Sequence, residues 1–277
     1  MGAAVAFGFG DYAAAMASRR AGVALTALGM QILGVGVLAL TLAALGRWPQ
    51  FSAEQVPWAL ALALVGTLSL AALYRAFALG PIAVVSPVVA SYAALSVVGI
   101  VLFLGERLAP GQILAIAATF VGVVLASTDV RALRRTGLSE GVRVGVLATI
   151  GFGIWGTILA AATRGNDPFA LVIVWRLFGI AMVAAFVLAR RVRLAPLALP
   201  ATLAIVAFVG VLDTGANLLL MLGVESGFAS FVMTGSGAYP IIPAVLAILV
   251  LGERLAPNQY LGVAVLVAGL VALGLQS

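Results

Sequence analysis

The sequence contains no cysteine and no histidine, and all fifteen of its basic residues are arginines. Without cysteine there can be no disulfide bond. Without cysteine or histidine there is no zinc site or haem ligated by those residues, and no Ser-His or Cys-His nucleophilic pair. We therefore expect no catalytic residues, no metal site and no cofactor.

Charged residues are also scarce, because they make up only 9% of the 277 residues while apolar residues make up 64%. A soluble domain has about 25% charged residues. The apolar runs are 18 to 23 residues long, which suits helices that cross a hydrocarbon layer about 30 Å thick. They lack the alternation of membrane β-strands. The sequence thus predicts an all-α membrane protein.

Arginine, glycine and proline divide these runs, for example at Arg19–Gly22, Arg47–Pro49 and Gly80–Pro81. The runs predict ten transmembrane helices, at 2–18, 22–45, 57–79, 82–104, 111–128, 142–163, 168–189, 200–222, 227–251 and 258–275.

The two halves of the chain repeat one another. The block Gly-Glu-Arg-Leu-Ala-Pro at Gly105–Pro110 recurs unchanged at Gly252–Pro257, a shift of 147 residues. Each half, 1–130 and 141–277, holds five predicted spans. Because five is odd, the second half enters the membrane with the opposite orientation, which predicts two inverted five-helix repeats with a site between them.

The repeated block, the ten spans and the Phe9-Gly10 and Trp155-Gly156 pairs early in each half resemble the EamA-type members of the drug/metabolite transporter (DMT) superfamily. Tyr239-Pro240 resembles the family's proline in the ninth span, whereas the first half has Ala93 at the position of Pro240. The resemblance implies a secondary transporter, often an exporter of amino acids or other small metabolites.

Four charged residues lie inside predicted spans: Asp11, Arg75, Arg176 and Asp213. Each costs about 2.5–3.5 kcal/mol or more at mid-membrane, so such groups are expected to face the interior and to have partners. Arg176 and Asp213 lie at similar depth on consecutive spans, which predicts an ion pair. Asp11 is left to pair with Arg75, unless Arg75 extends to the headgroups. The charged groups serve either substrate and proton binding or helix packing.

Polar and aromatic side chains within the spans are further candidates for a solute site. Gln31 is the repeat partner of Arg176, and Tyr92 is the repeat partner of Tyr239. The full set of expected substrate-binding residues is Asp11, Tyr12, Gln31, Tyr92, Trp155, Arg176, Asp213, Asn217 and Tyr239. Glu106 and Glu253 of the repeated block lie just past a span, where arginine can pair with them or cap a helix end, so we expect them to be structural.

We expect a small-molecule solute and the lipid bilayer as partners, and a coupling proton if Asp11 or Asp213 titrates. Nucleic acid is not expected, because the arginines lie in short loops as the positive-inside rule predicts. A membrane-embedded enzyme is the alternative, but the sequence lacks the clustered carboxylates or metal ligands that such enzymes usually need. The sequence does not separate a passive facilitator from a coupled transporter.

We predict a multi-pass protein of the inner cell membrane. The loops after the odd-numbered spans hold ten arginines, counting Arg143 at the start of the sixth span. The loops after the even-numbered spans hold three. This asymmetry predicts that the first set is cytoplasmic and both termini are outside. The EamA resemblance favours the opposite orientation, with both termini inside.

Overall fold

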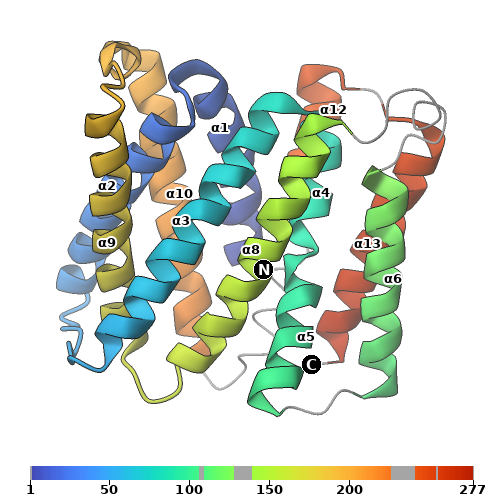
Figure 1. Cartoon of the computed structure of the whole chain (residues 1–277), viewed down its shortest axis with the longest axis horizontal. Coiled ribbons are helices and arrows are strands. Elements are labelled where there is room, and N and C mark those ends of the chain that lie inside the picture. Colours follow the sequence, from blue (N-terminus) through green and yellow to red (C-terminus); the bar gives the residue numbers. More distant parts are fainter. Residues whose placement is uncertain (1, 106–108, 128–138, 226–240, 254, 277) are drawn as a thin grey trace.

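A computed structural model describes residues 2–105, 109–127, 139–225, 241–253 and 255–276 of the chain. Within these ranges the chain is helical and contains no strand (Figure 1). The helices are α1 (Gly2–Ala21), α2 (Val23–Ala44), α3 (Gln55–Leu79), α4 (Ile82–Ala90), α5 (Tyr92–Leu104), α6 (Pro110–Ser127), α8 (Glu140–Ala162), α9 (Pro168–Ala189), the short 3-10 helix η1 (Ala195–Ala198), α10 (Pro200–Glu225), α12 (Ile241–Leu251) and α13 (Pro257–Leu275).

Six helical segments are long and apolar enough to cross a membrane: α2, α3, the α4–α5 unit, α8, α9 and α10. Shorter apolar stretches lie in α6 and α13. The prediction of an all-α membrane protein is therefore confirmed for the described residues. The helices begin and end within a few residues of the predicted spans, although the predicted span 227–251 is described only from residue 241. The total of ten spans stays a prediction.

Local sequence explains where several helices begin and end. Asp167 caps α9, because its Oδ1 accepts hydrogen bonds from the backbone N–H groups of Phe169 and Ala170, both at 2.9 Å. At the other type of boundary, Gly105 and Gly252 adopt positive φ angles of 73° and 66° directly after α5 and α12. Left-handed backbone at a helix end favours glycine, which explains the glycine that opens each repeated block.

The fourth predicted span is broken at Ser91, between α4 and α5. The Val88 carbonyl accepts hydrogen bonds from the hydroxyls of Ser91 at 2.6 Å and of Thr149 in α8 at 2.9 Å. Carbonyls released by a break inside a membrane need such partners. Ser91 itself and Thr149 of the neighbouring α8 therefore stabilise the break, which lies four residues beyond Pro87.

The helices α2 and α9 pack across the two halves in a reciprocal way. A methyl group added to Gly34 of α2 would lie 2.5 Å from Nη1 of Arg176 in α9, and one added to Gly179 of α9 would lie 2.9 Å from Nε2 of Gln31 in α2. Each long polar side chain thus occupies space left by a glycine of the other helix. Since the earlier residue on α2 faces the later one on α9, the helices run antiparallel.

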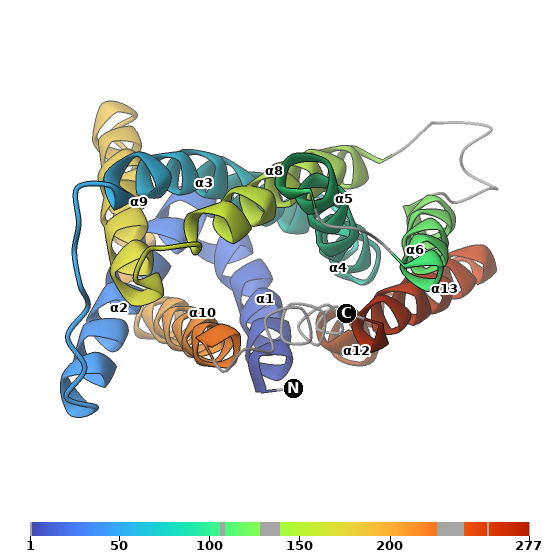
Figure 2. The same ribbon diagram turned by 90° about the horizontal axis from the view of Figure 1, so that it is seen from below.

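The other contacts between the halves also come in matched pairs. Helix α1 packs on α10 as α3 packs on α8, and α2 packs on α10 as α9 packs on α3. Helix α5 packs on α8 as α12 packs on α1, while α6 and α13 pack on each other. Viewed from below, α2, α9 and α10 lie at one end of an elongated assembly, and α6 and α13 lie at the other (Figure 2). The two halves therefore interlock.

Glu253 of the second repeated block joins the halves at the face where α1, α3 and α12 end. Its two carboxylate oxygens accept hydrogen bonds from the N–H groups of Ile82 and Ala83, at 3.1 and 2.9 Å, and so cap the N-terminus of α4. Arg19 lies 3.8 Å from Glu253 and donates to the carbonyls of Phe77 and Gly80, each at 3.2 Å. The expected pairing of Glu253 with arginine is confirmed, whereas its cap of α4 was not expected; Glu106 lies outside the described residues. We call this face the Arg19 face.

Candidate functional site

A cavity of about 200 Å³ lies between the two halves. Seven helices contribute to its wall: α1, α2, α3 and α5 from the first half and α8, α9 and α10 from the second. At its deep end are Met30 and Leu73, and beyond them Tyr74 and Phe77 are buried towards the Arg19 face. At its other end Ile100 lies only one turn from the end of α5. The cavity therefore lies nearer the face opposite the Arg19 face.

An ion pair between Arg176 and Asp213 forms one wall of the cavity. Nη2 of Arg176 donates to Oδ2 of Asp213, and Asn217 donates from Nδ2 to the same oxygen at 3.3 Å and to the Asp213 backbone carbonyl at 2.7 Å. Asn217 lies one turn after Asp213 on α10, so it reaches both acceptors. The Arg176 side chain is 4% exposed and that of Asp213 is 23% exposed. The predicted pair is confirmed, with the carboxylate nearer the open space.

Several hydrogen-bond donors beside this pair have no acceptor among the described residues. Nε and Nη1 of Arg176, Nε2 of Gln31 and Oγ1 of Thr214 are buried and have no hydrogen-bond partner within the described part of the chain. Leaving buried donors unpaired costs about 1–3 kcal/mol each. The cluster therefore favours an acceptor, either water or an oxygen of a bound solute.

Aromatic side chains form a second, continuous wall. The ring centroids of Tyr92 and Phe152 are 5.6 Å apart, those of Phe152 and Trp155 are 6.5 Å apart, and those of Trp155 and Trp175 are 5.5 Å apart. Gly66 makes room for this wall, because a methyl group there would lie 2.9 Å from Nε1 of Trp155. The wall runs from α5 across α8 to α9 and ends one residue before Arg176. It suits a solute with an apolar or aromatic body.

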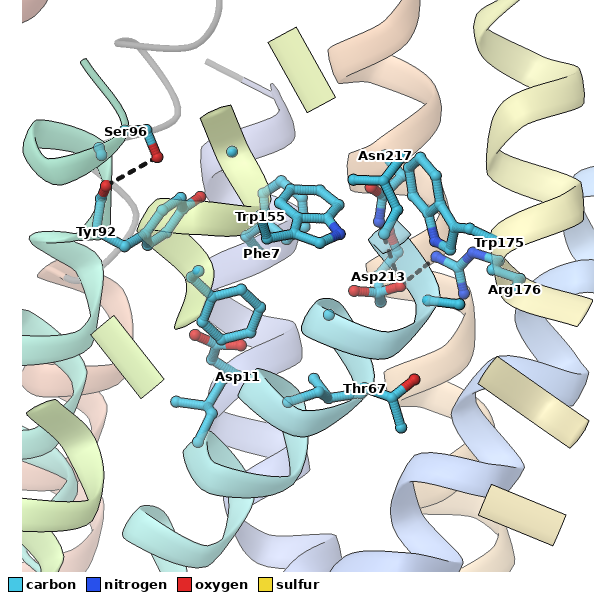
Figure 3. A pocket seen from close by; sticks show the side chains of 18 of the residues that line it. Phe7, Asp11, Thr67, Tyr92, Ser96, Trp155, Trp175, Arg176, Asp213 and Asn217 are labelled. Atoms are coloured by element: carbon cyan, nitrogen blue, oxygen red, sulfur yellow. Dashed lines mark hydrogen bonds and ion pairs between the residues drawn. The ribbon is translucent and has the colours of Figure 1, made fainter. Parts of the chain in front are cut away.

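Asp11 lies on a different part of the wall from the ion pair, as Figure 3 shows. Its half-buried side chain accepts no hydrogen bond and forms no ion pair within the described part of the chain. The pairing with Arg75 is wrong, because Arg75 is exposed on α3 and does not line the cavity. Exposure of Arg75 agrees with the alternative that it extends to the headgroups.

The cavity brings together seven of the nine residues expected from the sequence: Asp11, Gln31, Tyr92, Trp155, Arg176, Asp213 and Asn217. Tyr12 does not line it, because the residue after Asp11 is turned by about 100° around the helix. Tyr239 lies outside the described residues.

Three aromatic residues of the wall were not expected from the sequence: Phe7, Phe152 and Trp175. Two of them had a signal in their spacing. Phe7 precedes Asp11 by four residues, Phe152 precedes Trp155 by three, and Trp175 is adjacent to Arg176. Residues three or four apart share a helix face, so a search around the charged and aromatic candidates finds two of the three.

Comparison with known proteins gives a consistent result. A family model described as the EamA-like transporter family matches residues 1–128 and 139–275. No curated protein sequence matches the chain. A solved structure titled "Crystal structure of protein" has a TM-score of 0.65 and 19% sequence identity, and the match covers 98% of this chain and 96% of that one. At this identity the likeness concerns the fold alone.

Proposed function

The chain belongs to the EamA-like transporter family of the DMT superfamily, and from this premise we propose that it is a secondary transporter. In this proposal a small organic solute binds in the cavity between the halves and crosses the membrane by alternating access. The resemblance favours export of amino acids or other small metabolites across the inner cell membrane.

We infer ten spans in two inverted repeats, 1–130 and 141–277. The family model supports two repeats because it matches the chain twice. The antiparallel contact of α2 with α9, and the matched pairing of α1 with α10 and of α3 with α8, support the inversion. Two such halves have two nearly equivalent arrangements, each open to one side of the membrane.

The observation that carries the proposal is the Arg176–Asp213 pair in the wall of this cavity. Charges at membrane depth are costly and mark solute or ion pathways. A pair used only for packing would have its remaining polar atoms satisfied by protein, whereas here several donors beside it have no partner among the described residues.

Transport by the purified protein in proteoliposomes tests the proposal. A panel of amino acids and other metabolites is first screened for solutes that raise the thermal unfolding midpoint, and the active ones are then measured in uptake and counterflow assays. Counterflow with an imposed pH gradient tests proton coupling. Accumulation against a gradient distinguishes a coupled transporter from a passive facilitator.

Two arginine variants serve as the test and its matched control in this assay. Arg176→Ala should abolish transport, because it removes the guanidinium from the cavity wall. Arg75→Ala should leave transport unchanged, because Arg75 is exposed and lies outside the wall. The proposal fails if no solute in the panel moves or stabilises the protein, or if Arg176→Ala retains full transport in a folded protein.

A further inference from the structure

The charged side chains that line the cavity do not balance. They are Asp11, Arg176 and Asp213, and the ion pair uses the guanidinium of Arg176 with one of the two carboxylates. Segment 226–240 contains no acidic or basic residue, so it adds no compensating charge. Asp11 is thus an acid without a basic partner in the described cavity, at a depth where an unpaired charge is costly.

Aromatic rings lie on the same wall as this acid. Phe7 is one turn before Asp11 on α1, and Phe7 and Tyr92 pack against the same apolar cluster around Ala4 and Ala90. From Tyr92 the aromatic wall continues through Phe152 and Trp155. The faces of aromatic rings attract organic cations, and recognition of ammonium groups combines such rings with a carboxylate.

We propose that Asp11 binds the positively charged nitrogen of the solute, so that the cavity takes an organic ammonium compound with an apolar or aromatic body. This inference rests on the proposed function, because it assigns the chemistry of the solute in that same cavity. A metal cation fits less well. Calcium needs six to eight oxygen ligands, whereas Asp11 is the one carboxylate of the described wall that lies outside the ion pair.

Tryptophan fluorescence provides a binding assay that does not depend on transport. The chain has four tryptophans, of which Trp155 and Trp175 line the cavity while Trp48 and Trp58 are exposed. In a Trp48→Phe/Trp58→Phe background, the remaining fluorescence comes from the cavity alone. The probes are 2-phenylethylamine, the uncharged 2-phenylethanol and the anion 3-phenylpropionate, which have similar size but different charge.

We expect the amine to bind saturably and about tenfold or more tightly than the alcohol, as expected for a charge contact reinforced by aromatic rings. Asp11→Asn should remove this preference and leave binding of the alcohol unchanged. Glu54→Gln is the matched control: it also removes one negative charge, but Glu54 is exposed at the start of α3 and its side chain makes no capping hydrogen bond. It should bind the amine as the parent does.

Three results would each overturn the inference: the amine fails to bind the folded protein, 3-phenylpropionate binds more tightly than the amine, or Asp11→Asn keeps the preference for the amine. Transport separates this inference from the proposed function. If the amine binds through Asp11 but no solute crosses the bilayer, the ammonium site stands and the transporter fails. If carboxylates cross and amines neither bind nor cross, the transporter stands and the ammonium site fails.

Discussion

At the scale of single residues, the Arg176–Asp213 pair makes the folded protein depend on keeping two charges together. Removing one partner leaves the other charge without compensation, which costs about 3–5 kcal/mol at a fully buried site. Since the Asp213 side chain is 23% exposed to the cavity, we expect about 2–4 kcal/mol here.

A double-mutant cycle measures this dependence. Arg176→Gln and Asp213→Asn should each lower the thermal unfolding midpoint in detergent, and the double variant should regain most of the loss because two neutral amides can bond to each other. If the double variant loses as much as the two single variants combined, the residues act independently and the pair does not stabilise the fold.

The close contact of α2 with Arg176 requires glycine at position 34, which the residue type alone would not reveal. A methyl group there would lie 2.5 Å from Nη1 of Arg176 and 2.6 Å from Oγ1 of Thr214. Gly34→Ala should therefore displace the guanidinium, at a cost of about 1–3 kcal/mol for overpacking, and should reduce solute transport.

Gly36 provides the control on the same helix. Nothing lies within 4 Å of a methyl group added there, so Gly36→Ala should be neutral or should stabilise α2 by up to about 1 kcal/mol. Thermal unfolding and proteoliposome uptake measure both variants. Equal behaviour of the two would contradict the close contact of α2 with Arg176.

At the scale of helices, two carboxylates each cap a helix start, one from a residue next to the helix and one from a residue far away in the sequence. Asp167 caps α9 from the adjacent position, whereas Glu253 caps α4 from 170 residues away. Loss of a cap costs about 0.5–2 kcal/mol. Glu253→Ala should therefore speed amide hydrogen exchange in the first turn of α4 by about 2- to 30-fold, while the first turn of α9 is unaffected.

Asp167→Ala should have the converse effect, on α9 alone. Hydrogen exchange followed by mass spectrometry resolves the two helix starts in one experiment. If Glu253→Ala speeds exchange at both helix starts, its effect is general destabilisation rather than loss of a cap.

These two caps also show how far the sequence predicts the structure. Asp167 before Pro168 is a local signal for the start of a helix. The length and hydropathy of an apolar run likewise predict where a helix ends, because these features depend only on residues that are neighbours along the chain. The partner of Glu253 depends on which helices meet, and that follows from packing between the halves. Trp175 was not expected for the same reason, since the face that a nearly uniformly apolar helix turns inward has little trace in its sequence.

At the scale of the whole molecule, the inverted repeat explains the interlocking of the halves but does not make them equal. Gln31 and Arg176 are repeat partners, and so are Gly34 and Gly179 at the same shift of 145 residues. The contacts between them are reciprocal, yet only the second half supplies a charge. The symmetric fold thus carries an asymmetric site, with the ion pair on α9 and α10 and the unpaired acid on α1.

The described arrangement is also asymmetric across the membrane. Among the described residues, the buried side chains of Tyr74 and Phe77 and the contacts of Arg19 with Glu253 lie between the cavity and the Arg19 face. The arginine count predicts that this face is cytoplasmic. The cavity should therefore be accessible from outside the cell and closed to the cytoplasm.

Because the chain contains no cysteine, single introduced thiols test this access directly. A membrane-impermeant maleimide added to intact cells should label Thr67→Cys, which lies in the cavity wall. It should label Ser69→Cys roughly tenfold more slowly or not at all, because Ser69 is 3% exposed and packs against Gly151 of α8. Equal labelling of the two would contradict the described wall. If Thr67→Cys is labelled only in inside-out vesicles, the cavity faces the cytoplasm and the orientation predicted from the arginines is reversed.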